Sequence, residues 1–289
     1  MISGERFIGQ AFGLRWESDC DIPWFAEMPD DGGIADVQVE RALVLAPRQG
    51  GIAINHGELF EDGTRFYFEG AVLDMFDGRL IRWFAPHLDA VPVALGSTVA
   101  AQLLAWRGMV PLHGSAVAFD GVAILLAGAS GAGKSTLADA LVGCGGELVS
   151  DDLSVLLPIS GDGPPMLVPG RSAIRLNETI GAGKDESKRL SWPARVDANH
   201  PVPLSMLLLL RDEPIPSDPR VMAATLAAQL FRPRWMRKLP NAKARAATLL
   251  TAAQRIAYAT MAPASRARDV PPEDRAREAI ALWQRHRAR

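Results

Sequence analysis

The sequence predicts an α/β protein in which a small β-rich region precedes a larger domain built around a phosphate-binding loop. Three observations predict this class. Residues 1–90 hold short apolar or alternating runs between turn residues, a glycine-rich motif at residues 128–136 follows a strand-like run, and helical stretches rich in Ala and Leu dominate after residue 221. We therefore expect a β-rich domain over residues 1–90 and a phosphate-loop domain over residues 91–289, helical in its C-terminal part.

The N-terminal strands are predicted from runs that alternate or stay apolar for the length of a strand. The sequences Glu-Asp-Gly and Asp-Gly that separate them are typical of turns. The predicted strands cover residues 37–40, 51–54, 65–69 and 80–84. An amphipathic helix is expected next, over residues 95–106, with Val99, Leu103 and Leu104 on one apolar face.

The rest of the chain predicts a hairpin, a loop helix, further strands and a helical end. The hairpin joins residues 115–119 to residues 122–127 through Asp120-Gly121, a good turn sequence. Further strands are expected at residues 147–150, 153–157, 166–168 and 204–210. The helical end covers residues 221–264, with breaks at Pro233 and Pro240, and a last helix over residues 273–287.

The glycine-rich motif fits the phosphate-binding pattern G-x-x-x-x-G-K-S/T, between a strand and a helix as the mechanism requires. Glycines let the backbone close around the phosphates, Lys134 can reach the β- and γ-phosphates, and Ser135 offers a hydroxyl to Mg²⁺. We therefore expect ATP and Mg²⁺ as cofactors. The expected nucleotide-binding residues of the loop are Gly128, Ser130, Gly131, Ala132, Gly133, Lys134, Ser135 and Thr136.

Two adjacent carboxylates, Asp151 and Asp152, follow the strand predicted after the loop helix. Phosphoryl transfer uses carboxylates to support Mg²⁺ and to accept the proton of the attacking hydroxyl. Adjacent residues at a strand end point to opposite sides, so the two can take different roles. We expect Asp151 to be the general base and Asp152, with Ser135, to support the metal; the exchanged assignment stays open.

Four further residues are candidates for the same site. His113, just before the first hairpin strand, could orient the γ-phosphate or the nucleophile. Lys188 follows a polar stretch and could close over the triphosphate, and Arg171 and Arg175 could stabilise the charge of a transferred phosphoryl group. Each of the four also has a structural interpretation, as a packed or solvated side chain.

Composition argues against several other classes. The 289 residues carry a formal net charge of -2, which gives no electrostatic attraction for nucleic acid or an anionic membrane. Cys20 and Cys144 form no metal-ligand or disulfide pattern, and the sequence shows no secretory signal and no run near the roughly 18 apolar residues of a membrane span. We expect a cytoplasmic protein, and interpret Arg285, Arg287 and Arg289 as a solvated helix end.

Together these residues resemble the HPr serine kinase/phosphorylase family, through Leu112-His113-Gly114, residues 128–135, residues 146–152, and Pro169-Gly170 followed by Arg175-Leu176. The chain resembles in particular the shorter relatives encoded with lasso-peptide biosynthesis enzymes, which phosphorylate the C-terminal residue of a precursor peptide. The resemblance implies a phosphate-loop core of the HPr kinase/phosphoenolpyruvate carboxykinase type, a mixed sheet flanked by helices. It also implies a serine kinase that acts on a peptide or small protein, and it leaves a homo-oligomer open.

Two alternatives remain at this stage. One is a regulatory HPr kinase, although the Gly-rich capping loop of that branch has no counterpart between Asp152 and Pro169. The other is a nucleotide-gated binding module that transfers no phosphate. Such a module would need Lys134 but would not need His113 and Asp151 as catalytic partners.

Overall fold

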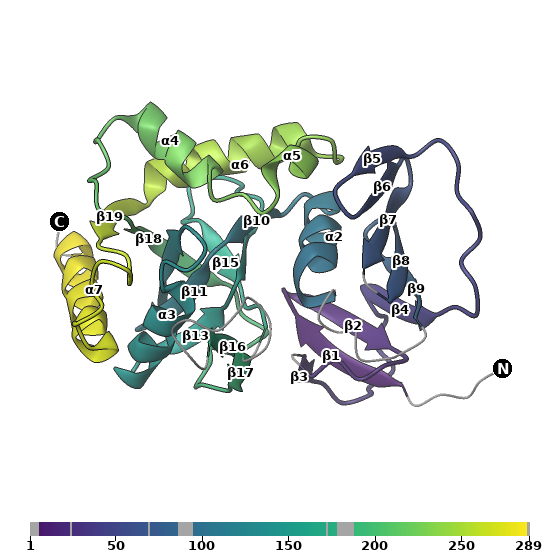
Figure 1. Cartoon of the computed structure of the whole chain (residues 1–289), viewed down its shortest axis with the longest axis horizontal. Helices are drawn as coiled ribbons and strands as arrows, with labels where there is room; N and C mark the ends of the chain where they lie inside the picture. The colour runs from purple at the N-terminus through teal and green to yellow at the C-terminus, as the bar shows by residue number, and fades with distance from the viewer. Residues whose placement is uncertain are drawn as a thin grey trace.

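The computed structural model describes residues 6–23, 25–68, 70–85, 95–171, 173–177 and 188–287 of the chain. Two large sheets, of nine and eight strands, and a separate two-stranded hairpin form its β structure. Figure 1 shows the two large sheets side by side, with most of the helices around the eight-stranded one. The expected α/β class, with sheets and flanking helices, is therefore confirmed.

The nine-stranded sheet contains all strands of the β-rich N-terminal region. They are β1 (Phe7–Ala11), β2 (Leu14–Ser18), β3 (Ala26–Glu27), β4 (Val37–Arg41), β5 (Ile52–Ile54), β6 (Gly57–Phe60), β7 (Gly63–Phe68), β8 (Ala71–Phe76) and β9 (Leu80–Phe84). In space their order is β3-β1-β2-β4-β9-β8-β7-β6-β5. The strands predicted from the sequence correspond to β4, β5, β7 and β9; the other five were not predicted.

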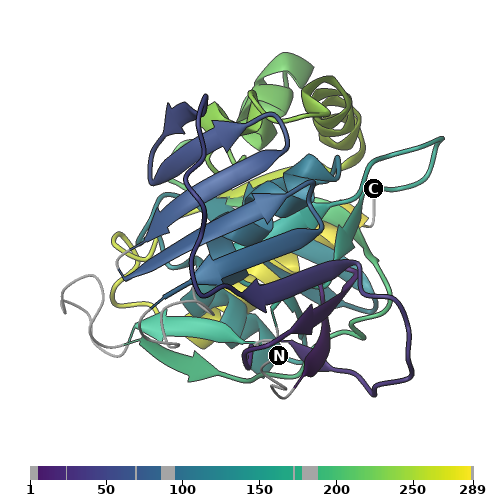
Figure 2. The same cartoon turned by 90° about the vertical axis from the view of Figure 1, so that its right-hand side faces the viewer.

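The inner face of this sheet is apolar and buried, as the alternation of side chains along a strand requires. Phe66, Leu73 and Ile81 are fully buried there. The segment that joins β4 to β5 runs across the outer face (Figure 2). Its Arg48 guanidinium lies 3.9 Å from the ring centroid of Phe60. The segment between β4 and β5 therefore covers part of the outer face of the nine-stranded sheet.

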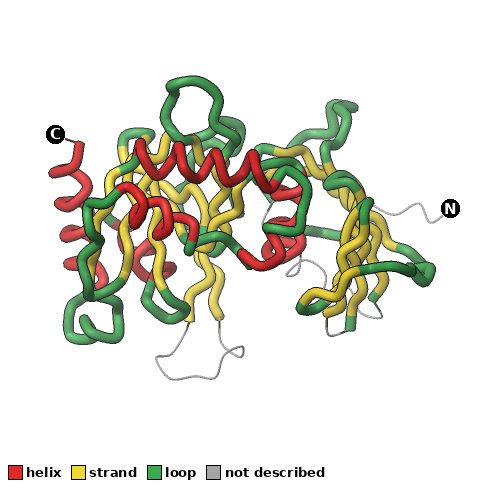
Figure 3. The backbone as a smooth tube through the Cα atoms, turned by 90° about the horizontal axis from the view of Figure 1, so that it is seen from above, coloured by secondary structure: helices red, strands yellow, loops and turns green. Residues whose placement is uncertain are grey.

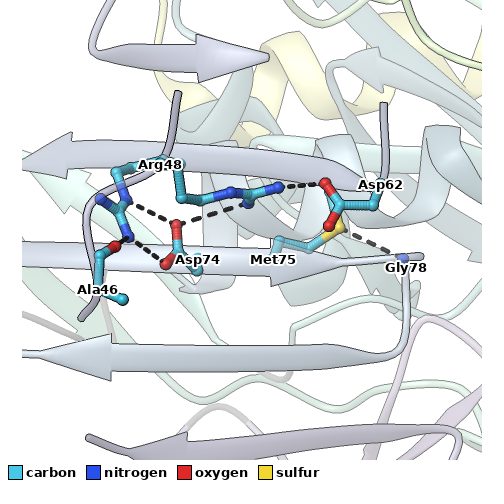
Figure 4. Close-up of polar contacts among 7 residues, drawn as sticks. Ala46, Arg48, Asp62, Asp74, Met75 and Gly78 are labelled. Atoms are coloured by element: carbon cyan, nitrogen blue, oxygen red, sulfur yellow. Dashed lines mark hydrogen bonds and ion pairs between the residues drawn. The ribbon is translucent and has the colours of Figure 1, made fainter. Parts of the chain in front are cut away.

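A buried ion pair ties this segment to the sheet. Arg65 on β7 donates to both carboxylate oxygens of Asp74 on β8, with Nε 2.8 Å from Oδ1, and to the carbonyl of Ala46 at 2.7 Å. Arg48 bridges Asp62 and the same Asp74 (Figure 4). A buried charge is stable only when it is paired and hydrogen-bonded, and here both partners are satisfied across neighbouring strands.

A short helix lies between the two sheets (Figure 1). The predicted helix at residues 95–106 forms as a π-helical turn, η2 (Leu95–Val99), continued by α2 (Ala100–Trp106). Leu103 and Leu104 are fully buried in the same apolar cluster as the N-terminal sheet. Whether residues 1–90 fold as a domain of their own stays a prediction.

The eight-stranded sheet carries the loop that the sequence predicts to bind phosphate. Its strands are β10 (Val110–His113), β11 (Ser115–Phe119), β12 (Val122–Gly128), β13 (Glu147–Ser150), β14 (Leu153–Leu156), β15 (Met166–Val168), β18 (Val202–Leu210) and β19 (Ala257–Met261). The order is β10-β14-β15-β18-β12-β11-β13, with β19 also paired to β18. Because β18 is parallel to β12 and β19 but antiparallel to β15, the sheet is mixed. The separate hairpin is β16 (Ile174–Asn177) with β17 (Lys188–Ser191).

Helices pack on both faces of this sheet, as the layered view in Figure 3 shows. One face contacts α3 (Lys134–Gly143) and α7 (Pro272–Arg287) through Leu137, Leu141 and Trp283. The other contacts α4 (Pro219–Ala227) and α6 (Ala242–Arg255) through Leu226 and Leu249, and α5 (Pro233–Met236) lies between α4 and α6 in the chain. No described helix is long and apolar enough to cross a membrane.

In the C-terminal part, a segment expected to be helical is a strand. Residues 221–264 were expected to be helical apart from two proline breaks, but Ala257–Met261 form β19, parallel to β18. Tyr258 and Thr260 have weak helix propensity and are of types enriched in strands, and β19 completes the sheet beside β18, a strand that is buried along most of its length. Tertiary pairing therefore overrides the helical composition that surrounds this segment.

Candidate functional site

The expected phosphate-binding loop, called the phosphate loop below, joins β12 to α3. Gly133, the residue before α3, has φ +93°, and a Cβ atom placed there would lie 2.8 Å from the Cβ of Ala264. Only glycine fits this conformation and this close approach without strain. Gly133 also offers no side-chain cap to α3, so the first N–H groups of the helix remain available to a ligand. The N-terminus of α3 is thus suited to an anion.

Lys134 is held by its own loop. Its Nζ donates to the carbonyl oxygens of Gly128 at 3.0 Å and Ala129 at 3.2 Å. Burial lowers the pKa of Lys134, while the nearby Asp152 and Asp151 raise it. The ammonium is therefore largely desolvated and carries only carbonyl partners in these bonds, an arrangement that a phosphate oxygen could replace with a stronger, charge-assisted bond.

The two carboxylates lie at the bend between β13 and β14 and face different partners. Asp151 is buried, and its Oδ1 accepts hydrogen bonds from Ser115 Oγ at 2.6 Å and Ser135 Oγ at 2.9 Å. Ser135 belongs to the phosphate loop, whereas Ser115 begins β11. The structure thus brings the loop hydroxyl together with Asp151, and the sequence analysis did not identify Ser115 as part of the site.

Asp152 occupies a different environment. Its backbone has φ +66°, in the left-handed region, and its side chain remains 37% exposed. Its carboxylate lies 3.4 Å from His113 Nδ1 and 3.6 Å from Arg171 Nη2. Arg171 also donates to the backbone carbonyl of Asp151 at 3.0 Å, so one buried guanidinium contacts both acidic residues. The left-handed bend directs the two carboxylates apart.

His113 reaches the acids because β10 pairs with β14, placing His113 opposite Leu153 in the antiparallel register. The next residue, Gly114, passes so close to β12 that a Cβ atom there would lie 2.6 Å from the carbonyl oxygen of Leu126. Burial and then the positive charge of Lys134 lower the pKa of His113, although Asp152 acts in the opposite direction. The imidazole is therefore neutral at physiological pH and can accept or donate a hydrogen bond.

The donors present fit Mg²⁺. Ser135 Oγ and the carboxylate of Asp151 are adjacent hard oxygen ligands. Within the described ranges, no group of three or more His, Cys, Asp or Glu side chains could hold a metal ion by itself. Mg²⁺ is usually bound by one or two protein oxygens together with waters and substrate phosphates, so a site completed by a nucleotide matches these residues.

A cavity of about 960 Å³ opens beside these groups. Gly128, Ala129 and Ser130 of the loop, together with His113 and Asp152, line part of it, and residues 228–233 line another part. The site thus has space next to the expected phosphates. The side chains of Lys188 and Arg175 lie outside the described part of the structure, so their expected roles stay predictions.

Comparisons with known proteins yield one distant structural likeness. No protein-family model and no curated protein matches the chain. Among solved structures, the Hpr(Ser) kinase/phosphatase from Coxiella burnetii aligns with 18% sequence identity and a TM-score of 0.26, over 38% of this chain. The chain spans 66% of the length of that protein. A likeness this distant carries no argument, so a functional assignment depends on the geometry of the site.

Proposed function

We propose that the protein is an ATP-dependent kinase that transfers the γ-phosphate to a serine hydroxyl of a peptide or small protein. One observation carries the proposal: the phosphate loop, His113 and Asp152 line a single cavity. A loop alone would support nucleotide binding of any kind. A histidine and a partly exposed carboxylate beside it supply the groups that a transfer reaction requires.

The proposed step is an in-line displacement. Asp152 accepts the proton of the acceptor hydroxyl, the acceptor oxygen forms a bond to the γ-phosphorus, and the bond from that phosphorus to the bridging oxygen breaks, releasing ADP. Lys134 and the loop N–H groups neutralise charge on the phosphates. His113, whose Nδ1 lies 3.4 Å from the Asp152 carboxylate, orients that carboxylate or the acceptor. Positioning and electrostatics supply most of the rate in such reactions.

The contacts favour the exchanged assignment of the two acids. Asp151 is buried and bonded to Ser135, which supports a role in holding Mg²⁺, whereas Asp152 lines the cavity and is accessible to a hydroxyl. Mg²⁺, when bound with the nucleotide, would neutralise phosphate charge. Asp151 and Ser135 are the residues that would hold it, and Asp152 becomes the candidate base.

The finer choice of acceptor follows the sequence resemblance. We propose a serine at the C-terminus of a lasso-peptide precursor as the acceptor, with cytoplasmic action. A regulatory HPr kinase and a nucleotide-gated binding module are the alternatives. Of these, the module is less supported, because it would not require a neutral histidine and a partly exposed carboxylate at the cavity.

The decisive experiment offers the intact protein γ-labelled ATP and Mg²⁺ with either a Ser-ending peptide or HPr. Label on the peptide supports the proposal, label on HPr supports the regulatory alternative, and nucleotide binding with label on neither supports the module. Lys134→Ala should abolish transfer and weaken nucleotide binding. Lys243→Ala, in the exposed first turn of α6, is the matched control and should retain both.

A further inference from the structure

The cavity has a second wall formed by residues 228–233, which we call the strap. The strap is attached to β10, the strand that ends in His113. The N–H of His113 donates to the carbonyl of Gln229 at 2.7 Å, and the N–H of Phe231 donates to the carbonyl of Pro111 at 3.0 Å. Leu112 and Leu230 form an antiparallel bridge between these bonds. The strap is therefore held in register with the candidate catalytic histidine.

Arg232, at the end of the strap, is the charged residue that this wall presents to the cavity. Its backbone has φ +52° and ψ +60°, a left-handed conformation that costs a residue other than glycine roughly 1–2 kcal/mol. Such strain persists where surrounding structure imposes it and is concentrated at functional sites. Phe231, whose buried ring lies 6.0 Å from the ring of His113, provides that structure.

The guanidinium of Arg232 lies beside two aromatic rings. It lies 5.3 Å from the ring centroid of Trp235 and 6.0 Å from that of Phe231. Within the part of the chain that the structure describes, it forms no ion pair. By contrast, Arg211 in the same cavity is paired with Glu213 at 3.2 Å. Arg232 is thus a positioned cation with an unused fork of donors, which suits a carboxylate.

We propose that Arg232 binds a carboxylate of the acceptor and so selects acceptors in which the serine lies beside a negative charge. This inference rests on the proposed function and names the substrate class of the same site. The nucleotide phosphates already have Lys134 and the N-terminus of α3, whereas the strap lies on the His113 side of the cavity. The carboxylate could be an aspartate side chain or a free C-terminus, and both present the same group to Arg232.

The test uses the intact protein loaded with Mg²⁺ and a non-hydrolysable ATP analogue. Three short peptides are titrated by calorimetry: one with Ser-Asp and a capped end, one with Ser-Asn and a capped end, and one ending in serine with a free carboxylate. A charge-assisted hydrogen bond is worth about tenfold in affinity. At least one carboxylate peptide should bind about tenfold more tightly than the Ser-Asn peptide, and which one does so distinguishes the two sources.

Arg232→Gln should remove this preference, while Arg234→Gln, an exposed arginine two residues away and outside the cavity lining, should retain it. The proposal is overturned by equal binding of all peptides to the unaltered protein. It is also overturned if the preference survives Arg232→Gln, or if that variant weakens binding of a fluorescent ATP analogue by about threefold or more, which would place the cation on the nucleotide.

Phosphoryl transfer to the same peptides is measured in parallel. Transfer without a carboxylate preference would remove the role of Arg232 and leave the kinase assignment intact. A preference in binding that depends on Arg232, without transfer to any peptide, would support the carboxylate site and contradict the kinase assignment. The experiment can therefore contradict the carboxylate site at Arg232 without contradicting the kinase assignment, and the reverse.

Discussion

At the scale of single residues, the site separates two identical side chains by their surroundings. Asp151 is buried and accepts from two serine hydroxyls, while Asp152 is partly exposed between His113 and Arg171. The left-handed backbone at Asp152 is what turns the second carboxylate away from the first. Under the proposed function, one of these two carboxylates supports the metal and its neighbour in the chain acts as the base.

Substitution of each carboxylate should separate these roles. Asp152→Asn should lower kcat by roughly 10²- to 10⁴-fold, the range for loss of a general base, with little change in nucleotide affinity. Asp151→Asn should instead raise the Mg²⁺ concentration needed for half-maximal activity by roughly 10- to 100-fold. Initial rates over a Mg²⁺ series, with fluorescent nucleotide titrations, measure both. The opposite pattern would restore Asp151 as the base.

His113 should titrate below the ordinary imidazole value of about 6.5, because burial and Lys134 both lower its pKa. Lys134→Met should raise that pKa by removing one of the two causes. An NMR titration of the His113 ring protons measures it in each protein. A His113 pKa at or above the ordinary value in the unaltered protein would contradict the burial argument.

The same shift links His113 to folding. Its folded-state pKa lies below its unfolded value, so the unfolded chain binds the proton more readily as the pH falls. The stabilising contribution is complete above about pH 6.5 and is lost as the pH drops through the folded pKa. Urea unfolding of the intact protein and of His113→Asn at a series of pH values should show a shallower acid slope for the variant.

At the scale of elements, the segment after β15 connects the N-terminal sheet to the acidic bend. The N–H of Phe12, in the turn between β1 and β2, donates to the carbonyl of Pro169 at 2.8 Å. Gly170 in turn donates to the carbonyl of Val149 at 2.8 Å, and Arg171 holds the two acids. A chain of contacts therefore connects the turn between β1 and β2, through residues 169–171, to the bend that carries Asp151 and Asp152.

Arg171 is a positioning residue in this arrangement, and its loss should misplace Asp152. Arg171→Met should lower kcat by about 100-fold, the effect expected of a displacement near 1 Å, while leaving the KM for ATP within about twofold. Arg171→Lys should recover part of kcat because it restores the charge. Steady-state kinetics of both variants, with circular dichroism as a check of folding, measure this. Equal rates for Met and Lys would contradict a positioning role.

At the scale of the whole molecule, the apolar core does not stop at residue 90. The cluster beneath the nine-stranded sheet includes Leu103 and Leu104 of α2, Val155 of β14 and Phe231 of the strap. The N-terminal sheet therefore shares its core with the helix and strands that frame the site. A core shared across residue 90 argues against a boundary there between two independently folding domains.

A fragment covering residues 91–289 tests that boundary. Removal of the sheet would expose the apolar face of α2, at a cost of about 25 cal/mol for each Å² of apolar surface left in water. We expect the fragment to bind a hydrophobic dye and to melt at a lower temperature, or without cooperativity, compared with the intact chain. A cooperative transition at the temperature of the intact protein would establish residues 91–289 as an independent domain.

The elements predicted correctly from the sequence are those whose structure is set by residues close together in the chain. The hairpin around Asp120-Gly121, the loop helix and the last helix follow from turn residues and periodicity, and the structure contains all three. β19 was missed because its five residues lie in a helical composition and are strand only through pairing with β18. Ser115 carries no motif of its own, so only its contact with Asp151 reveals it.

The expected phosphate-binding loop could be predicted from the sequence alone, because glycine spacing, a lysine and a following helix are local features; its phosphate-binding role stays a prediction. Which partner each aspartate faces was decided only by tertiary structure. Ser115 meets Asp151 across 36 positions of the chain, and the strap reaches His113 from residue 229. Contacts between such distant residues depend on sheet register and on the left-handed bend at Asp152, which spacing along a sequence does not encode.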